Sequence, residues 1–475
     1  SNFAASVPYS LKSQRETLTE FLDDLSKRDQ KMFLAVVTAA VSGRTMDELE
    51  SKTSALMSCA EGYGCRFSVL GFEQYEGLET VMPLGLRCVS PLRTLTSESL
   101  SALVPFRTRE VFHLPGGTYR GINTVSGSII SIDRSRLING NEFILGVPGS
   151  GKSFCAKNEI ASLAMRGDCD IVIVDPEREY SRLVRMIGGE TVCISPDSGC
   201  HINALDLVPA EEGDPVSEKS DFVLTLIGEI MEKDEPGPGE KSVIDRCLRK
   251  VLLRDGPGIP TLKDLRDEIS RQTDPGAAET ALALEIFTEG SLSTFSKPTN
   301  VDFSSHIVSY DISEMGRQLE PAAMLVILDS IAGRIERNRR SGRRTYLFID
   351  EFYLLMRRER SARFLSVLWK RVRKCGAFAT GITQNVDEVL GSPSASTMLA
   401  NSELTVMMRQ APQDLERLSG LLGIGKEAGK WLSSPDPGTG LIKVGNDLIP
   451  FTSGFPEGTE LYGLMTTRPG EAPAS

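Results

Sequence analysis

The stretch from Glu142 to Ala161 reads Glu-Phe-Ile-Leu-Gly-Val-Pro-Gly-Ser-Gly-Lys-Ser-Phe-Cys-Ala-Lys-Asn-Glu-Ile-Ala and contains the complete pattern G-x-x-x-x-G-K-[ST] at residues 146–153. An apolar run precedes this pattern and a helix-forming run follows it. That order predicts a buried strand, a glycine-rich turn whose amides wrap phosphates, and a helix whose positive dipole end faces them. The stretch therefore predicts a nucleotide-phosphate site in an α/β fold.

The residues of this phosphate loop have separate expected tasks. Lys152 would reach the β- and γ-phosphates of a nucleoside triphosphate, and the hydroxyl of Ser153 would hold Mg²⁺. The full set of residues expected to contact the nucleotide is Gly146, Pro148, Gly149, Ser150, Gly151, Lys152, Ser153 and Phe154.

Composition bounds the remaining possibilities. The 475 residues are 40% hydrophobic and 25% charged, which is typical of a globular chain with two or three domains. Nothing approaches the uninterrupted apolar run of a membrane span and no signal peptide opens the chain, so we expect a soluble protein or one docked on a membrane through partners. The net charge of −11 argues against a general nucleic-acid coat but not against a local basic channel.

Cysteine and histidine usage gives no sign of a metal site. The nine cysteines are odd in number and lack C-x-x-C spacing, which indicates neither zinc nor a disulfide framework and fits a reducing cytoplasm. His113, His201 and His306 share no spacing and are expected to be structural or surface residues. The chain starts Ser-Asn without a methionine, and we expect it to be a fragment of a longer protein.

Residues 1–110 form a separate compositional unit, which we expect to be a small α+β domain. Hydrophobic spacing predicts helices at Leu11–Ser26 and Thr45–Ala60, and strands at Met32–Val37 and Cys65–Leu70. Nothing in this region points to catalysis.

Residues 111–475 carry the pattern of a parallel sheet covered by helices on both faces. The expected strands are Ser128–Ile132, Glu142–Leu145, Asp170–Asp175, Ile307–Ile312, Thr345–Asp350, Phe378–Thr383, Thr405–Met408 and Gly440–Val444, with a long helix from Pro321 to Arg339. Between about 206 and 300, acidic and proline-glycine loops separate amphipathic helices at Asp221–Met231, Ser242–Leu253 and Thr261–Arg271. This part is predicted to be a mostly helical insertion.

An acidic pair ends one of the expected strands. Asp350 and Glu351 follow Thr-Tyr-Leu-Phe-Ile, which places Asp350 in the Mg²⁺ water shell and leaves Glu351 to polarise the water that attacks the γ-phosphorus. The alternative is a strand that ends in a solvated acidic turn. The phosphate loop in the same sheet favours the Mg²⁺ role. Asp175, Glu177 and Glu179, at the end of the strand that follows the phosphate loop, are further candidates for the site.

A polar cluster follows the next strand. Gln384, in Gly381-Ile-Thr-Gln-Asn385, could hydrogen-bond the γ-phosphate or the attacking water and report hydrolysis to the sheet, although such a strand exit alone is more often a turn.

Basic residues precede that strand in Lys370-Arg-Val-Arg-Lys374. A ring-shaped motor needs an arginine that reaches the phosphates of a neighbouring subunit, and Arg373 is the preferred candidate, with Arg371 and Arg409 as alternatives. The other interpretation is a solvated helix end. We interpret the basic segments at Arg334–Arg344 and 357–360 as solvated loops and not as a contact with nucleic acid or a partner, because aromatic residues are not interleaved with them.

Several of these motifs together resemble one known group. The motifs are the phosphate loop with Ala156-Lys157, Asp175-Pro-Glu-Arg-Glu-Tyr180, Ile202-Asn203, Phe348-Ile-Asp-Glu351, Gly381-Ile-Thr-Gln-Asn385 and Leu461-Tyr-Gly-Leu-Met-Thr-Thr467. In this order they resemble the VirB-four, TraC and TrbE type ATPases of conjugative type IV secretion systems, within the FtsK-HerA group of RecA-like motors. The forms in conjugative elements of Gram-positive bacteria are most similar. Ala204 departs from the family's Ile-Asn-Pro.

The resemblance implies a RecA-like P-loop core with an all-helical insertion, preceded by a small α+β domain. It implies an ATP- and Mg²⁺-dependent motor that energises channel assembly or the transfer of DNA or protein, acts as a hexamer or dimer, and lies in the cytoplasm at the inner face of the membrane. Its expected partners are inner-membrane channel components and the coupling protein, with DNA as a possible ligand. It also implies that Arg373 occupies the spacing of the FtsK-type arginine.

Two other functions remain open from the sequence. The first is a DNA-translocating coupling protein of the same FtsK-HerA group. The second is a scaffold of the channel that binds nucleotide with negligible turnover.

Overall fold

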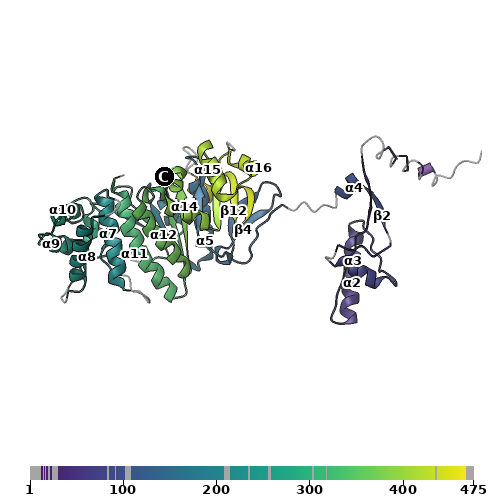
Figure 1. The fold of residues 1–475 in the computed structure, drawn as a ribbon, viewed down its shortest axis with the longest axis horizontal. Coiled ribbons are helices and arrows are strands. Elements are labelled where there is room, and N and C mark those ends of the chain that lie inside the picture. The colour runs from purple at the N-terminus through teal and green to yellow at the C-terminus, as the bar shows by residue number, and fades with distance from the viewer. Residues whose placement is uncertain are drawn as a thin grey trace, which may run out of the picture. The chain divides into compact units, whose positions relative to one another are not determined.

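The computed structural model describes residues 30–466, apart from short gaps, and a few positions between 12 and 23. The gaps are 83–84, 91, 102–107, 208–213, 234–235, 255–257, 302–303, 317 and 434–435. The chain divides into two compact units, an N-terminal unit Ser1–Arg107 and a C-terminal unit Thr108–Ser475 (Figure 1). Among the described residues, no helix is long and apolar enough to cross a membrane.

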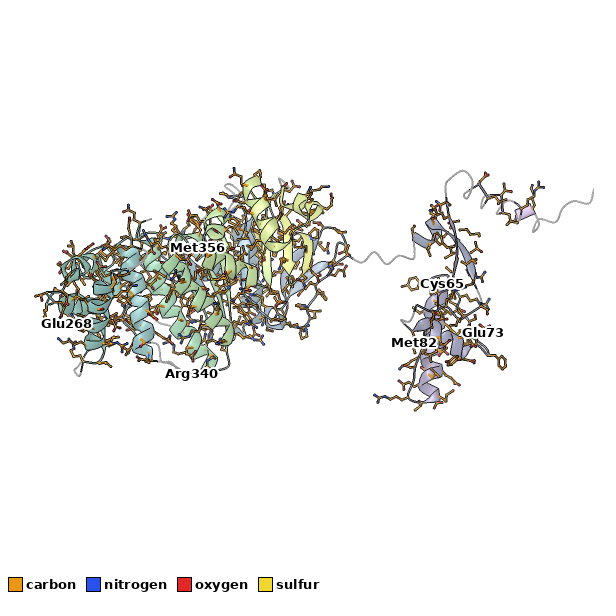
Figure 2. The ribbon with its side chains drawn as sticks, viewed as in Figure 1. Cys65, Glu73, Met82, Glu268, Arg340 and Met356 are labelled. Carbon is orange, nitrogen blue, oxygen red and sulfur yellow. The ribbon has the colours of Figure 1, made fainter. Side chains whose placement is uncertain are left out.

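The N-terminal unit consists of short elements with exposed apolar side chains. Its antiparallel strands are β1 (Met32–Ala35) and β2 (Arg93–Thr96), and its helices are α2 (Met46–Gly62), α3 (Gln74–Val81) and α4 (Ser97–Ser101). The side chain of Thr45 caps α2 by accepting a hydrogen bond from the Glu48 amide at 3.2 Å. Figure 2 shows Cys65, Glu73 and Met82 on this unit.

One sequence prediction in this unit is wrong and another cannot be compared. The segment Cys65–Leu70 is not a strand, because β1 pairs with β2 instead and the apolar Val69 stays 71% exposed. The apolar composition of the segment suggested burial that does not occur. The helix predicted at Leu11–Ser26 lies largely outside the described residues.

The C-terminal unit is built on one 11-stranded sheet with the order β4-β3-β13-β12-β11-β5-β10-β9-β6-β8-β7. Its strands are β3 (Thr118–Asn123), β4 (Ile129–Ile132), β5 (Glu142–Leu145), β6 (Cys169–Asp175), β7 (Glu190–Cys193), β8 (Ile307–Asp311), β9 (Arg344–Ile349), β10 (Ala377–Thr383), β11 (Leu404–Met408), β12 (Thr439–Val444) and β13 (Asp447–Thr452). Neighbours from β11 to β7 are parallel, which confirms the predicted α/β core.

From β11 to β4 all neighbours are antiparallel, so a meander extends the parallel core on one side. The sequence predicted only part of this meander. It identified β4 and β12, but it missed β3 and β13, in which polar, glycine or proline residues interrupt the apolar pattern. It also missed the short outer strand β7.

Alternate side chains of each strand enter two different cores, as expected for a sheet that is buried on both faces. Phe143 and Leu145 of β5 belong to one core and Ile144 to the other. The helices on the Phe143 face include α11 (Glu320–Arg340) and α12 (Glu359–Lys374), and those on the Ile144 face are α5 (Lys152–Arg166), α6 (Ser181–Met186) and α17 (Glu460–Met465).

A helical insertion separates β7 from β8. It contains α7 (Pro215–Ile230), α8 (Pro238–Leu252), α9 (Leu262–Ile269) and α10 (Ala277–Thr288), which confirms the predicted helical character. These helices gather at one end of the C-terminal unit, where Glu268 is labelled, and β4 and β12 lie toward the other end (Figures 1 and 2). The remaining helices are α13 (Val386–Gly391), α14 (Pro393–Asn401), α15 (Pro412–Leu422) and α16 (Lys426–Gly429).

The interpretation of Arg334–Arg344 as a solvated loop is wrong. Arg334 lies within α11, is 2% exposed and donates to the buried Asp170 carboxylate at 2.6 Å. Arg343 donates to the same carboxylate at 2.6 Å. Asp170 is the second residue of β6 and is buried, and a buried carboxylate needs such counter-charges. The arginines therefore have a structural task that their composition alone did not reveal.

Candidate nucleotide site

The phosphate loop leaves the carboxyl end of β5 and is held by both neighbouring strands. The Gly146 amide donates to Thr383 O at the end of β10 at 3.4 Å, and the Val147 amide donates to Arg409 O, just after β11, at 2.9 Å. Gly149 and Gly151 adopt φ of 73° and 105°, which side chains rarely tolerate. A Cβ on Gly151 would also lie 3.0 Å from the Gly438 amide nitrogen. The loop therefore requires glycine at these positions.

The order of the strands brings the predicted polar residues together. Parallel strands end at the same edge of a sheet, and β10 lies between β5 and β9. Gln384, directly after β10, therefore lies between the phosphate loop and Glu351, which follows β9 by two residues. The Gln384 side-chain amide donates to Glu351 Oε1 at 2.8 Å. The structure thus places Lys152, Asp350, Glu351 and Gln384 at one edge.

The backbone at Glu351 is strained. Its φ and ψ of 48° and 40° lie in the left-handed region, which costs about 1–3 kcal/mol for a residue other than glycine. The next residue, Phe352, is fully buried and packs its ring against Phe143 of β5 at 5.2 Å and Trp369 of α12 at 5.4 Å. This packing holds the turn, so the Glu351 carboxylate is kept near Gln384 although the backbone resists it.

Five acidic residues converge at this edge and form what we call the carboxylate cluster: Asp175, Glu177, Glu179, Asp350 and Glu351. Burial and the Glu179 charge raise the pKa of Asp350 to about 7. Burial and the Asp350 charge raise the pKa of Glu351 to about 8. Both side chains are 8% exposed. The edge therefore has an excess of negative charge that favours a cation.

The exit of β6 organises part of this cluster. The Asp175 carboxylate accepts the Glu179 amide at 2.9 Å and the Tyr180 amide at 3.0 Å, and burial raises the pKa of Asp175 to about 6. Asp175 therefore shapes the turn that carries Glu177 and Glu179. Glu177 is exposed, and Glu179 is half-buried with its Oε2 atom unpaired.

Two lysines of α5 face the cluster. Burial lowers the pKa of Lys152, while Asp350 and Glu351 oppose this effect, and its ammonium donates to Val147 O at 3.2 Å. Lys157 is 2% exposed, and its ammonium lies 5.5 Å from the centre of the Tyr180 ring. The sequence analysis assigned no role to Lys157 or Tyr180. Lys157 shares a helix face with Ile160 and Ala161, three and four residues further on, and a lysine among such apolar positions is the signal that could have found it.

Several buried polar atoms at the site have no protein partner, which tests the fit to a phosphate and a cation. Among the described residues these include Ser150 Oγ, Glu179 Oε2 and Glu351 Oε2. Buried polar groups normally have a partner, so atoms left open in one place indicate a ligand. The described residues contain no metal site of three or more His, Cys, Asp or Glu side chains. Mg²⁺ at phosphates usually has only one or two protein ligands, so the residues fit this ion.

The three candidate arginines lie in different places. Arg373 is exposed near the end of α12, before β10 begins, and therefore lies at the sheet edge opposite to Gln384. It lines a groove of about 900 Å³ with Lys370, Lys374 and Lys443. Arg371 donates to Glu218 of α7 at 2.6 Å. Arg409 follows β11 beside the phosphate loop of its own chain. Of the three, Arg373 alone lies away from its own loop and has no ion-pair partner among the residues that the structure describes.

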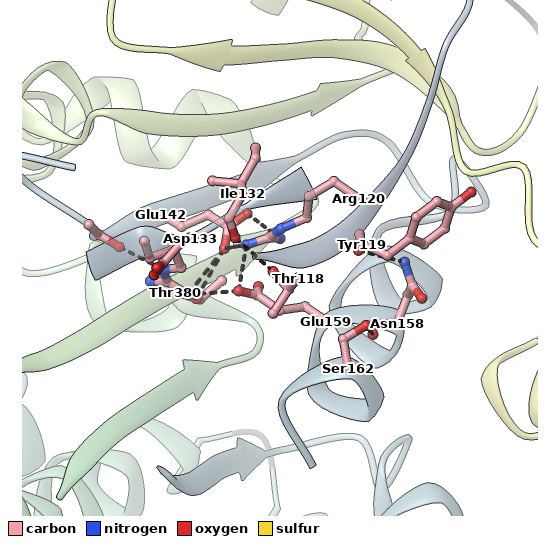
Figure 3. A network of polar contacts seen from close by, with 12 residues as sticks. Thr118, Tyr119, Arg120, Ile132, Asp133, Glu142, Asn158, Glu159, Ser162 and Thr380 are labelled. Atoms are coloured by element: carbon pink, nitrogen blue, oxygen red, sulfur yellow. Dashed lines mark hydrogen bonds and ion pairs between the residues drawn. The ribbon is translucent and has the colours of Figure 1, made fainter. Parts of the chain in front are cut away.

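A second group of buried charges lies at the beginning of β5, and we call it the ion-pair network. It consists of Arg120 of β3, Arg134, Glu142 of β5 and Glu159 of α5, all at most 1% exposed. Arg120 donates to both Glu142 oxygens, at 2.8 and 3.1 Å, and also pairs with Glu159 (Figure 3). Arg134 donates to Thr380 Oγ1 of β10 at 2.8 Å. The network ties the strands around the loop to the helix that follows it.

A parallel sheet that bears a glycine-rich phosphate loop, with an extra strand between this loop and the acidic strand end, defines a P-loop NTPase with a RecA-like core. The family model of the TraG P-loop domain matches residues 124–249 and 301–434, more than half of the chain. The chain therefore belongs to the TraG P-loop domain family. The match leaves out residues 250–300, which are the second half of the helical insertion.

Solved structures agree with this assignment. VirB4 of Thermoanaerobacter pseudethanolicus is similar with a TM-score of 0.64 and 25% identity, over 72% of this chain and 97% of that chain. The bacterial conjugative coupling protein TrwB, in complex with sulphate, has a TM-score of 0.50 and 15% identity, over 73% of this chain and 91% of that one. The predicted resemblance to the VirB-four group is confirmed. No curated protein matches the chain at a significant level.

Proposed function

We propose that this chain is a Mg²⁺-dependent ATPase that drives a conjugative type IV secretion system. The observation that carries the proposal is the joint position of Lys152, Glu351 and Gln384 at one sheet edge, with Gln384 2.8 Å from Glu351. The likeness to VirB4 supports the secretion role. The plasmid coupling protein TrwB, which has a TM-score of 0.50 and 15% identity to this chain, is known in complex with ADP and Mg²⁺, and this supports the same ligands here.

The phosphate end of the nucleotide would be held by the loop amides and the Lys152 ammonium. Lys152 stays close to carboxylates that favour its charged form, so it can pair with the phosphates. Ser153 and Asp350 would hold Mg²⁺, which neutralises phosphate charge when it is bound. The other residues of the phosphate loop complete the cradle through their backbones.

Glu351 would polarise the attacking water and Gln384 would orient Glu351. The raised pKa of Glu351, about 8, matches a base that must take up a proton near neutral pH. The hydrogen bond from Gln384 leaves Glu351 Oε2 open toward the site. Asp175, Glu177 and Glu179 would act on the electrostatics of the site and would not contact the phosphorus.

Arg373 would act on the nucleotide of a neighbouring subunit. It lies at the edge opposite to its own phosphate loop, so it reaches phosphates only when a second copy docks there. Such an arginine in trans implies a ring, for which we propose a hexamer. The motor would work in the cytoplasm beside the membrane, bound to channel components and the coupling protein.

The test measures ATP hydrolysis per mole of protein against protein concentration, with Mg²⁺. Specific activity should rise as subunits assemble, and Arg373→Ala should lower it by about 10³-fold. Mixing Arg373→Ala with Glu351→Gln should restore part of the activity. At one kind of mixed interface the Glu351→Gln subunit supplies an intact Arg373 to the site of the Arg373→Ala subunit, which keeps Glu351. Lys374→Ala, a neighbouring exposed cation, is the matched control and should change little.

The same experiment separates the alternatives. Activity that is independent of concentration, with no recovery on mixing, would contradict the trans arrangement. Negligible turnover at every concentration would favour a nucleotide-gated scaffold. Strong stimulation by DNA, with salt-sensitive DNA binding, would favour a coupling protein.

A further inference from the structure

Three aromatic side chains gather around the first turn of α5, directly after the phosphate loop. Phe154 belongs to the first turn of α5, Phe455 follows β13, and Tyr462 lies on α17. The ring centres are 6.1 Å apart for Phe154 and Phe455, and 5.5 Å apart for Phe154 and Tyr462. We call these residues the aromatic cluster.

The aromatic cluster is not part of either hydrophobic core. Each of its three residues is partly exposed, and none belongs to the core on either face of the sheet. The same helix α17 buries Leu464 and Met465, which are 9% and 0% exposed. Tyr462 is therefore held by an anchored helix while its ring remains accessible. Partly open aromatic surface at a nucleotide site is available to stack with a ligand.

The segment that carries Phe455 is fixed to the phosphate loop. The Gly438 amide donates to Ser150 O at 2.8 Å, and the Ser453 amide donates to Gly438 O at 2.8 Å. From the other side, the Tyr119 hydroxyl donates to Ser453 O at 3.1 Å. Phe455 therefore lies two residues after Ser453, which is linked to the phosphate loop through Gly438.

The direction of the nucleotide follows from the two sides of the loop. Lys152, Glu351 and Gln384 mark the γ-phosphate end, toward β10 and β9. The nucleoside must leave the loop at its other end. On the β11 and β12 side the loop is bordered by the Gly438 segment, to which the segment before Phe455 is bonded. From Phe455 the chain continues to α17, which packs against α5 and α6.

We propose that the aromatic cluster is the nucleobase subsite, in which the base of the bound nucleotide stacks on the faces of Phe455 and Tyr462. This rests on the proposed function, because it needs a nucleotide in the phosphate loop. Stacking on the faces of Phe455 and Tyr462 contacts the plane of the base and does not read its edge. The subsite therefore prefers the larger purines over pyrimidines and separates adenine from guanine only weakly.

The test compares ligands with and without a base by titration calorimetry of the full chain with Mg²⁺. The ligands are ADP, GDP, CDP and inorganic tripolyphosphate. Wild type should bind ADP and GDP within a few-fold of each other, and both about tenfold more tightly than CDP. Phe455→Ala and Tyr462→Ala should each weaken ADP and GDP about tenfold and leave tripolyphosphate unchanged.

Two further variants keep the result interpretable. Tyr462→Phe preserves the ring face and should bind ADP as wild type does. Phe112→Ala removes a ring that is 56% exposed and should have no effect. ADP affinity that is unchanged in Phe455→Ala and Tyr462→Ala would overturn the proposal. An equal loss of ADP and tripolyphosphate would also overturn it, since the cluster would then only support the loop.

The same titrations distinguish a failure of the proposed ATPase function from a failure of the base subsite. A wild-type chain that binds neither ADP nor tripolyphosphate would overturn the proposed ATPase, and the base subsite with it. A chain that binds both equally well would retain its phosphate site and would contradict the base subsite alone.

Discussion

Two groups of charged residues lie at opposite ends of β5, and they differ in their charge balance. The ion-pair network at the start of β5 has two arginines and two glutamates, each at most 1% exposed. The carboxylate cluster, about 13 Å further along the strand direction, has five acidic residues against Lys152 and Lys157.

The difference indicates which group is structural and which is functional. Both groups have buried atoms without a protein partner, which in the ion-pair network are Arg120 Nε and Glu159 Oε2, and burial raises the pKa of Glu142 there to about 7. In the ion-pair network, however, two arginines balance two glutamates and pair with them directly, so the network needs no further cation. In the carboxylate cluster five acidic residues face only two lysines, and burial together with the neighbouring carboxylates raises the pKa values of Asp350 and Glu351. A buried group with unbalanced charge costs stability that a bound cation can restore.

Removing one charge from the ion-pair network should have the largest effect on stability. Arg120→Met leaves Glu142 and Glu159 buried without a counter-charge, which should lower the free energy of unfolding by about 3–5 kcal/mol. Urea unfolding followed by tryptophan fluorescence measures this change. Arg109→Met removes an ion pair with Asp447 in which the arginine is 66% exposed, and should cost less than about 1 kcal/mol. Equal losses in the two variants would contradict a structural role that depends on burial.

Removing a charge from the nucleotide edge should change binding more than folding. Lys152→Ala should weaken Mg·ATP binding by about 100-fold, because the phosphates lose a charged partner in a buried site. Its free energy of unfolding should change less than that of Arg120→Met, because Lys152 is partly buried whereas Arg120 is 1% exposed. Fluorescent nucleotide titration measures the affinity, and Lys370→Ala at the opposite edge is the control. Wild-type affinity in Lys152→Ala would refute the assignment of the loop.

A change of pH is expected to have a smaller effect on the stability of the nucleotide-free protein. The pKa values of Asp350 and Glu351, about 7 and about 8, lie above the ordinary values near 4 of the unfolded chain. The folded protein therefore binds more protons than the unfolded chain between about pH 4 and pH 8. The stability that these protons contribute is complete below pH 4 and is lost as the pH rises through 7 and 8.

The melting temperature of the nucleotide-free protein should therefore fall by about 2–4 °C between pH 6 and pH 9. Asp350→Asn removes one of the two groups and should reduce this dependence. A melting temperature that rises over the same range, or an unchanged slope in the variant, would argue against the raised pKa values.

Part of the nucleotide site could be predicted from the sequence, and part could not. The strand, loop and helix from Glu142 to Ala161, the acidic pair and the polar cluster at Gln384 could be found because each is a continuous segment with a local pattern. The position of Gln384 beside Glu351 could not be read from spacing, because it depends on the insertion of β10 between β5 and β9. Their roles remain proposals until activity is measured.

Other features depend on contacts between distant segments. In the sequence, Arg120 is 22 residues from Glu142 and 39 residues from Glu159. Each of them looks like an ordinary surface charge in its own segment, and only the fold brings them together. The wrong strand at Cys65–Leu70 has the same origin, since a local β pattern does not supply a partner strand.

The most direct test of the account separates binding from hydrolysis in Glu351→Gln. The substitution keeps the size of the side chain and an oxygen that can accept from Gln384, but it removes the base. If Glu351 is the base, Mg·ATP affinity should stay within a few-fold of wild type and phosphate release should slow by about 10³-fold, measured on the same protein at saturating nucleotide. Phosphate release at the wild-type rate would contradict the claim that the unbalanced carboxylate cluster is a hydrolytic site.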